Sequence, residues 1–358
     1  MTETTLQQIQ GATSDVQRTW IITEAILSSF PSVLQQAILA AGVPHWFNAV
    51  VLAGLLEIDT SDSENLLQVI QNLSFSEPFG QTNYALHDLT RAAILWHLRN
   101  QQASQLQLFN ERAYQYFSTV SDTHYQLEAI YHLWQVDAEA GFLRFKDEMR
   151  NFRNASDFGS ANTLLRYIQE LADVGLLSTQ AVANLDRQIY WTGRRRAKLG
   201  QNEQDPGRAE AHFREALRLW GDSVEGMPNT QAISRPLDFK QHIEQKNQAY
   251  LEQKLGDARQ AEDVIRQGIW LTELGNFHTE KEAWQTALDS HHQAIQLNPT
   301  DAKAIASRGE THRLMGNYEA ALADFDRAIE LDEKYDWAIA SRGQTYGAMG
   351  NYEAALAD

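Results

Sequence analysis

Two consecutive segments near the C-terminal end of the sequence are almost identical, and this repeat limits the fold more than any other feature. The string AIASRG begins at Ala304 and again at Ala338, and MGNYEAALAD begins at Met315 and again at Met349. Both strings recur with a period of 34 residues, which is typical of arrays of helical hairpins. A single hairpin cannot bury its own apolar face, so neighbouring hairpins must stack into a solenoid.

The residues within one period show how each hairpin would form. Gly309 lets two antiparallel helices approach closely, and Gly316 supplies the left-handed backbone that ends the first helix. Phe325 then fills the space between neighbouring hairpins. This pattern resembles the tetratricopeptide repeat (TPR), and the resemblance implies an all-α fold, a right-handed α-solenoid. One period earlier the pattern recurs around Gly275, although His291 stands where a phenylalanine is expected. We expect residues 237–358 to form such repeats, the last one truncated.

Upstream of these repeats the period is less regular. Residues 104–220 have continuous helical patterning with short breaks, which predicts degenerate TPR-like repeats. Residues 221–236 contain two prolines and two glycines, and we interpret them as a loop or insertion. Residues 1–15 are polar, and we expect a flexible N-terminus.

Residues 16–103 predict a small domain of another kind. Apolar patterning indicates several short helices, one of them from Trp46 to Leu56, followed by a β-hairpin within residues 73–86 and a further helix. This order resembles a winged helix. The string YALHDLTR, from Tyr84 to Arg91, is similar to a motif in the winged helix of STAND-type signalling ATPases, where helical-repeat sensors follow. That resemblance implies a nucleotide contact for His87.

No other part of a nucleotide site accompanies His87. The sequence contains no G-x-x-x-x-G-K-[ST] phosphate loop, so the resemblance is to the sensor region without the NTPase domain. We therefore expect His87 to pack in the corner between hairpin and helix, with Asp88 capping that helix.

Composition and motifs exclude several classes of function. There is no cysteine, and the net charge of −17 argues against broad binding to phosphate backbones. No metal-ligand spacing or nucleophile motif occurs, so we expect no enzyme, catalytic residue, metal or cofactor. No apolar run is long enough to span a bilayer and no signal peptide is evident, which predicts a cytoplasmic protein with no membrane partner.

One basic cluster stands out from the acidic background. It consists of Arg194, Arg195, Arg196 and Lys198, and it lies next to Trp191. Such a cluster can bind nucleic acid, or it can complement the dipole at a helix end. Recognition helices normally carry several cations, but the helix from Trp46 to Leu56 carries none. We therefore expect no nucleic-acid partner, and a regulator that binds nucleic acid through the winged helix or this cluster is the alternative.

The remaining prediction is a binding surface for a protein or peptide. In TPR arrays the first helix of each hairpin lines the concave groove. The register places these residues there: Lys303, Glu310, Arg313, Trp337 and Gln344. Ser307 and Ser341 replace the asparagine of carboxylate-clamp repeats, so binding of acidic C-terminal tails is not predicted.

The leading hypothesis is a non-enzymatic scaffold or sensor within a STAND-like signalling or defence system. A regulatory subunit that docks an enzyme on another chain is a third hypothesis. The last repeat stops within its second helix, which predicts either a piece of a longer array or self-association through the uncapped face.

Overall fold

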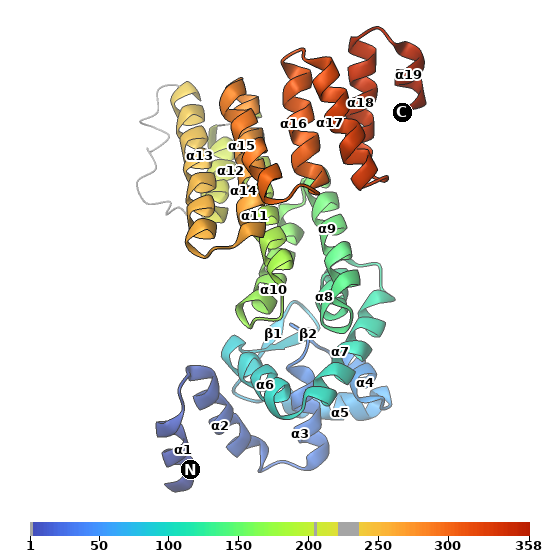
Figure 1. Ribbon diagram of the computed structural model, residues 1–358. Helices are drawn as coiled ribbons and strands as arrows, with labels where there is room; N and C mark the ends of the chain where they lie inside the picture. The colour runs from blue at the N-terminus through green and yellow to red at the C-terminus, as the bar shows by residue number, and fades with distance from the viewer. Residues whose placement is uncertain (1–2, 204–205, 221–235) are drawn as a thin grey trace. The chain divides into compact units, whose positions relative to one another are not determined.

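The computed structural model describes residues 3–203, 206–220 and 236–358, and these are almost entirely helical (Figure 1). Most of the predicted loop at 221–236 lies outside the described residues. The chain divides into two compact units, Met1–Glu170 and Leu171–Asp358, each with its own packing. The first unit combines the winged-helix segment with part of the stretch predicted as degenerate repeats.

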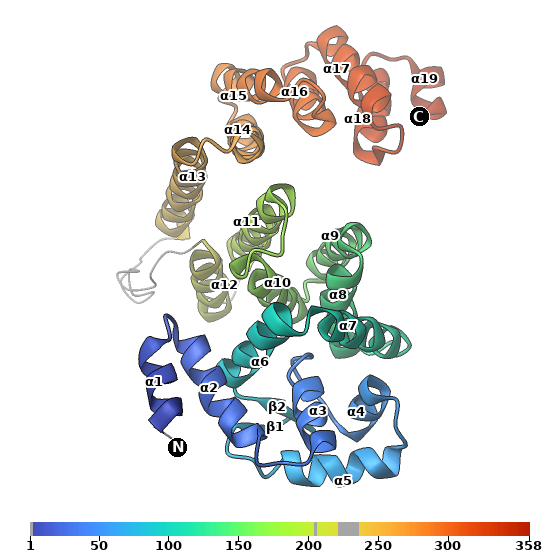
Figure 2. The ribbon, with the colours of Figure 1, turned by 60° about the horizontal axis from the view of Figure 1, so that its bottom comes forward.

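The first unit begins with helices and a hairpin and continues as antiparallel helices (Figure 2). Its elements are α1 (Glu3–Gly11), α2 (Asp15–Leu27), α3 (Ser32–Ala41), α4 (Ala49–Leu56), α5 (Thr60–Ile70), β1 (Ser76–Phe79), β2 (Asn83–Leu86), α6 (Asp88–Gln101), α7 (Ala103–Ser118), α8 (Thr123–Val136), α9 (Ala138–Ala155) and α10 (Phe158–Asp173).

The predicted β-hairpin is present. Strands β1 and β2 pair antiparallel, from Ser76 opposite Leu86 to Phe79 opposite Asn83. Gly80 turns the chain between them with a φ of 69°. Phe47 adds a third, single-residue strand, because its N–H and C=O both bond Tyr84 at 2.8 Å. The hairpin and Phe47 thus form one small antiparallel sheet.

The helix predicted from Trp46 to Leu56 is shorter than expected. Trp46 and Phe47 precede it, and α4 begins only after Asn48, whose side chain accepts a hydrogen bond from the N–H of Val51. Helix α5 directly precedes the β-hairpin, so in the predicted winged helix it takes the position of the recognition helix. Its sequence, TSDSENLLQVI, contains two carboxylates and neither lysine nor arginine.

One hydrophobic core joins the winged-helix segment to the helices that follow it. Trp46 and Phe47 are fully buried, and the ring of Trp46 meets Phe117 of α7 edge-on at 5.3 Å. Ala113 of α7 and Ala129 of α8 belong to the same cluster. Residues on both sides of position 104 therefore fold together as one unit.

The second unit is a row of helical hairpins. Its helices are α11 (Thr179–Asn202), α12 (Pro206–Leu219), α13 (Pro236–Gln260), α14 (Val264–Glu280), α15 (Trp284–Leu297), α16 (Ala302–Leu314), α17 (Tyr318–Leu331), α18 (Asp336–Ala348) and α19 (Tyr352–Ala357). Helices α14 and α15, α16 and α17, and α18 and α19 pack as antiparallel pairs (Figure 1).

The repeated residues have the structural roles expected of them. A Cβ atom on Gly309 would lie 3.1 Å from the Phe325 ring, so glycine allows α16 and α17 to pack closely. Gly316 and Gly350 end the first helices with φ values of 81° and 79°. Phe325 itself is fully buried in the core of this hairpin.

His291 of α15 occupies the position that Phe325 has one repeat later. Its ring is fully buried against Gly275, where a Cβ atom would come within 2.5 Å of it. Neither ring nitrogen has a hydrogen-bond partner within the described part of the chain. Burial, together with the nearby charges of Arg308, His292 and His312, lowers the pKa of His291 to about 3.

Candidate partner-binding surface

The first helices of successive hairpins form one continuous layer in the second unit. Helix α14 packs against both α11 and α16, and α16 contacts α18. All five side chains predicted to bind a partner lie on α16 and α18. Their environments differ, and this difference divides them into two groups.

Lys303 is held by a buried carboxylate. Glu273 of α14 is fully buried, and its Oε1 atom accepts hydrogen bonds from Lys303 Nζ at 2.6 Å and Arg187 Nε at 2.8 Å. The indole N–H of Trp191 donates to the same oxygen at 3.4 Å, and the Lys303 ammonium lies 5.7 Å from the centre of that indole ring. Lys303 therefore links α16 to α14 and α11.

Glu310 and Arg313 pair with each other along α16. Two parallel hydrogen bonds join them, from Nε to Oε2 at 2.8 Å and from Nη2 to Oε1 at 2.7 Å. The hydrogen bonds that Arg313 donates to Glu310 raise the pKa of Arg313. This pair leaves α16 with no net charge at these two positions.

Trp337 and Gln344 lie seven residues apart on α18, both exposed. Trp337 is 41% exposed, and its ring rests edge-on against Phe325 with centroids 6.4 Å apart. Tyr335 lies 5.9 Å away on the other side. The exposed Ala340 leaves room between Trp337 and Gln344. Part of an aromatic ring and an amide are thus exposed on α18.

Comparison with known proteins assigns the hairpin that carries this surface. Residues 302–335 match the family model described as "Tetratricopeptide repeat". Residues 302–335 are a tetratricopeptide repeat. TPRs are typically non-enzymatic modules for protein interaction, and the match covers α16, α17 and the loop that leads to α18. The search of curated proteins gave no match.

Solved structures resemble this chain only distantly. MamA is 15% identical, with 50% of this chain and 90% of MamA covered and a TM-score of 0.28. A STAND protein with a TPR sensor from Pyrococcus horikoshii is 12% identical, with 92% and 56% covered and a TM-score of 0.31. A human IFIT1 dimer with m7Gppp-AAAA is 14% identical, with 86% and 65% covered and a TM-score of 0.35. These TM-scores carry no argument about function.

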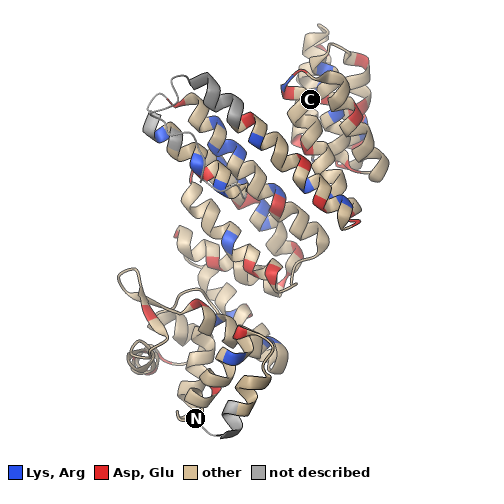
Figure 3. Cartoon of the chain, turned by 90° about the vertical axis from the view of Figure 1, so that its left-hand side faces the viewer, with Lys and Arg blue, Asp and Glu red and all other residues tan. Residues whose placement is uncertain are grey.

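In the basic cluster of Arg194, Arg195, Arg196 and Lys198, two side chains contact other residues of the chain and two are exposed. Arg194 pairs with Glu280 of α14 and lies 4.9 Å from the ring centre of Trp191, while Arg196 approaches His212 at 3.4 Å. Arg195 and Lys198 are exposed. Positive and negative residues are interspersed along the helices of the chain (Figure 3).

The expectation for His87 and Asp88 was wrong. Asp88 is the first residue of α6 rather than its N-cap, and the cap position is held by His87, which makes no side-chain capping bond. His87 is exposed, and its Nε2 atom lies 3.8 Å from Glu77. The residue of the YALHDLTR string with a buried charge is Arg91, which is 7% exposed.

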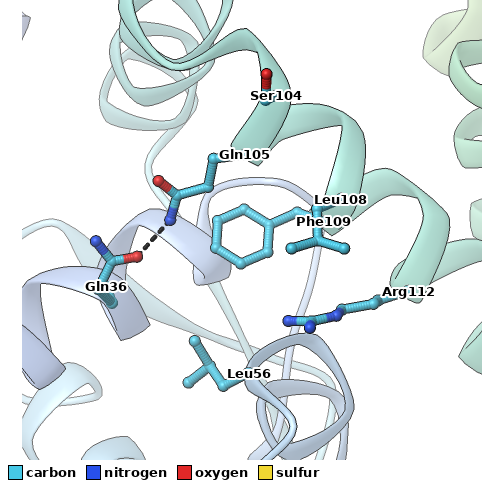
Figure 4. Close-up of a pocket in the computed structure, with 7 residues that line it drawn as sticks. All are labelled: Gln36, Leu56, Ser104, Gln105, Leu108, Phe109 and Arg112. Atoms are coloured by element: carbon cyan, nitrogen blue, oxygen red, sulfur yellow. Dashed lines mark hydrogen bonds between the residues drawn. The ribbon is translucent and has the colours of Figure 1, made fainter.

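An apolar cavity of about 470 Å³ opens in the first unit (Figure 4). Its lining comes from α3, α4 and α7: Gln36, Leu56, Ser104, Gln105, Leu108, Phe109 and Arg112. Two of its polar side chains are paired within the chain: Gln105 bonds Gln36, and Arg112 bonds both the carbonyl of Leu55 at 2.8 Å and Glu57. The cavity therefore offers apolar shape but no free charge.

Sequence reasoning missed Arg187, Glu273 and the buried charges of the first unit. A signal for Glu273 does exist, because it is the one charged residue in the apolar run IWLTELG. Glu128 likewise interrupts YQLEAIYHLW. Within the described ranges, no group of three metal-ligating side chains occurs, and none of the helices there combines the length and apolar character needed to cross a bilayer.

Proposed function

We propose that this protein is a recognition module that binds a segment of another protein on the layer of α14, α16 and α18. Trp337 and Gln344 make the direct contacts. Lys303, Glu310 and Arg313 shape the surface beside them. The observation that carries this proposal is an exposed tryptophan on the first helix of the hairpin that follows the matched repeat, beside charges that are already paired within the chain.

The pairing of charges bears on the kind of partner. An ion pair with the partner would have to replace Glu273–Lys303 or Glu310–Arg313, so it would add little net free energy. Burying the exposed part of Trp337 adds apolar contact without such an exchange, and tryptophan is a common anchor of interfaces. The proposed partner segment is therefore neutral and apolar at its point of contact.

The order of a winged-helix segment and helical repeats supports a STAND-like signalling setting for this binding. The alternative, a nucleic-acid regulator, would depend on Arg195 and Lys198, the exposed members of the basic cluster. Helix α5, with two carboxylates and no cation, does not favour it.

Capture of partners from a lysate of the source organism, followed by affinity measurement with the recovered protein, tests the proposal. Trp337→Ala should weaken binding by roughly 30-fold, because an anchor tryptophan contributes about 2 kcal/mol or more. The dissociation constant of the wild type should change little between about 0.05 M and 0.5 M salt, because no free charge pairs form.

Leu108→Ala is the matched control, because Leu108 is also 41% exposed but lies on α7 of the first unit. It should bind as the wild type does. Equal affinity of Trp337→Ala and Leu108→Ala would refute the proposed surface. Loss of the captured partner after nuclease treatment would instead support the alternative, in which the protein binds nucleic acid through Arg195 and Lys198.

A further inference from the structure

Four ionisable side chains from distant segments meet inside the first unit. His45 lies in the loop between α3 and α4, Arg91 in α6, Glu128 in α8 and Glu170 in α10. The side chain of Glu128 is fully buried, those of His45 and Arg91 are 8% and 9% exposed, and that of Glu170 is 35% exposed. Buried charges persist in proteins only where they are paired, so this cluster must be internally matched.

His45 lies between the two carboxylates. Its Nδ1 atom is 3.1 Å from Oε1 of Glu128, and its Nε2 atom is 3.2 Å from Oε2 of Glu170. The imidazole stacks on Tyr167 of α10 with centroids 3.4 Å apart and meets Tyr131 of α8 edge-on at 4.6 Å. Both ring nitrogens and both ring faces are thereby fixed.

Arg91 contacts the same carboxylate oxygen of Glu170 as His45 does. Its Nη1 atom bonds Oε2 of Glu170 at 2.7 Å, and its Nε atom donates to the carbonyl of Pro44 at 3.1 Å. Its Nη2 atom reaches the hydroxyl of Tyr131 at 3.2 Å. Arg91 thus orients the loop that carries His45 as well as the carboxylate that His45 faces.

The pKa values of both carboxylates that face His45 are lowered. Burial alone would raise the pKa of Glu170, but the hydrogen bond and charge of His45 and the charge of Arg91 lower it to about 2. The pKa of Glu128 is also held below its usual range, because His45 and His132 outweigh its burial. Ionised carboxylates only accept hydrogen bonds, whereas a neutral imidazole has a single N–H to donate. Two carboxylate partners therefore require two N–H groups.

We infer that His45 is an imidazolium at neutral pH, and that its charge fastens α10 to the winged-helix segment of the first unit. When the ring loses one proton, one nitrogen presents a lone pair to a carboxylate. Glu128 cannot reach water, whereas Glu170 is partly exposed. Glu170 therefore separates from His45, which removes one of the two charged contacts that hold α10 at this point, while Arg91 keeps the other.

Other titratable or charged groups also face this cluster, and the Nε2 atom of His132 lies 3.4 Å from Oε2 of Glu128. The remaining titratable or charged side chains that face the cluster are Arg99 of α6, Tyr131 and His132 of α8, and Arg166 and Tyr167 of α10. Burial lowers the pKa of His132, whose Nδ1 lies 2.7 Å from the Oδ1 atom of Asn110. Within the described ranges, His45 is the residue whose ring nitrogens face both carboxylates, so its charge acts together with that of Arg91 to hold α10.

Long-range ¹H–¹⁵N NMR of the ¹⁵N-histidine-labelled full chain tests the charge directly. His45→Gln identifies the His45 signals by their disappearance. Both ring nitrogens of His45 should carry a proton at pH 7. A nitrogen without a proton at that pH would overturn the inference, because it would mean a neutral ring and a protonated carboxyl.

Hydrogen exchange of the amides of α10 tests the mechanical consequence. In His45→Gln, protection of α10 at pH 7 should fall by about tenfold or more, and in the wild type it should fall similarly once NMR shows His45 deprotonated. His124→Gln, an exposed histidine of α8, is the control and should match the wild type. Unchanged α10 protection in His45→Gln with native circular dichroism would refute the fastening role.

Discussion

Replacing His291 by phenylalanine should stabilise the protein. His291 is fully buried, and neither of its ring nitrogens has a hydrogen-bond partner among the described residues. The next repeat has Phe325 in the equivalent position, packed against Gly309 as His291 packs against Gly275. The substitution thus installs a side chain that the same hairpin already accommodates one period later.

The magnitude follows from the two nitrogens and the added volume. A buried polar group without a partner costs about 1–3 kcal/mol, and His291 has two such atoms. The tight contact with Gly275 opposes the larger ring, and overpacking typically costs about 1–3 kcal/mol. The free energy of unfolding at pH 7 should therefore rise by about 2 kcal/mol.

The stabilisation by His291→Phe should increase as the pH falls. The folded-state pKa of His291 is about 3, against 6.5 for an exposed histidine, so below pH 6.5 the unfolded chain binds a proton that the native chain does not. The wild type therefore loses stability as the pH falls from 6.5 towards 3, by up to about 1.4 kcal/mol per pH unit. Phenylalanine removes this loss, so the difference between variant and wild type should be about 2 kcal/mol larger at pH 5 than at pH 7.

Urea unfolding followed by far-ultraviolet circular dichroism at both pH values measures these differences. His292→Phe is the control, because His292 is the exposed neighbour on α15, and its effect should stay within about 0.5 kcal/mol. A lower urea midpoint for His291→Phe at pH 7, or a gain that does not grow at pH 5, would refute the reasoning.

Two further predictions concern the second unit. Gly316→Ala should lower the free energy of unfolding by about 1 kcal/mol, because the φ of 81° at this position strains any side chain. Gly347→Ala should raise the free energy of unfolding by up to about 1 kcal/mol, because Gly347 lies within α18 with open space around it and alanine favours a helix more than glycine does. Thermal unfolding of both variants checks the opposite signs. Glu273→Gln should cost about 2 kcal/mol, because it leaves Lys303 and Arg187 without their shared carboxylate. Urea unfolding measures this loss, and a neutral result would contradict a structural role for Glu273.

The sequence by itself determined the local architecture. The features that could be interpreted without any distant contact each concern a single hairpin or its neighbour. They are the 34-residue period, the glycines at Gly309 and Gly316, and the alternating pattern around Gly80. The departure at His291 was visible for the same reason. Even the layer of first helices followed from the register that placed Trp337 and Gln344 together.

Only the tertiary structure decided which charges are free. Lys303 and Trp337 look equally available in the sequence, but Lys303 is bound to Glu273, thirty residues earlier on another helix. His45 and Glu170 are 125 residues apart, and no local pattern connects them. An ion pair between helices depends on how those helices pack, and packing is a property of the whole unit. The charge that fastens α10 and the neutral surface proposed for a partner therefore both emerge only when the chain is folded.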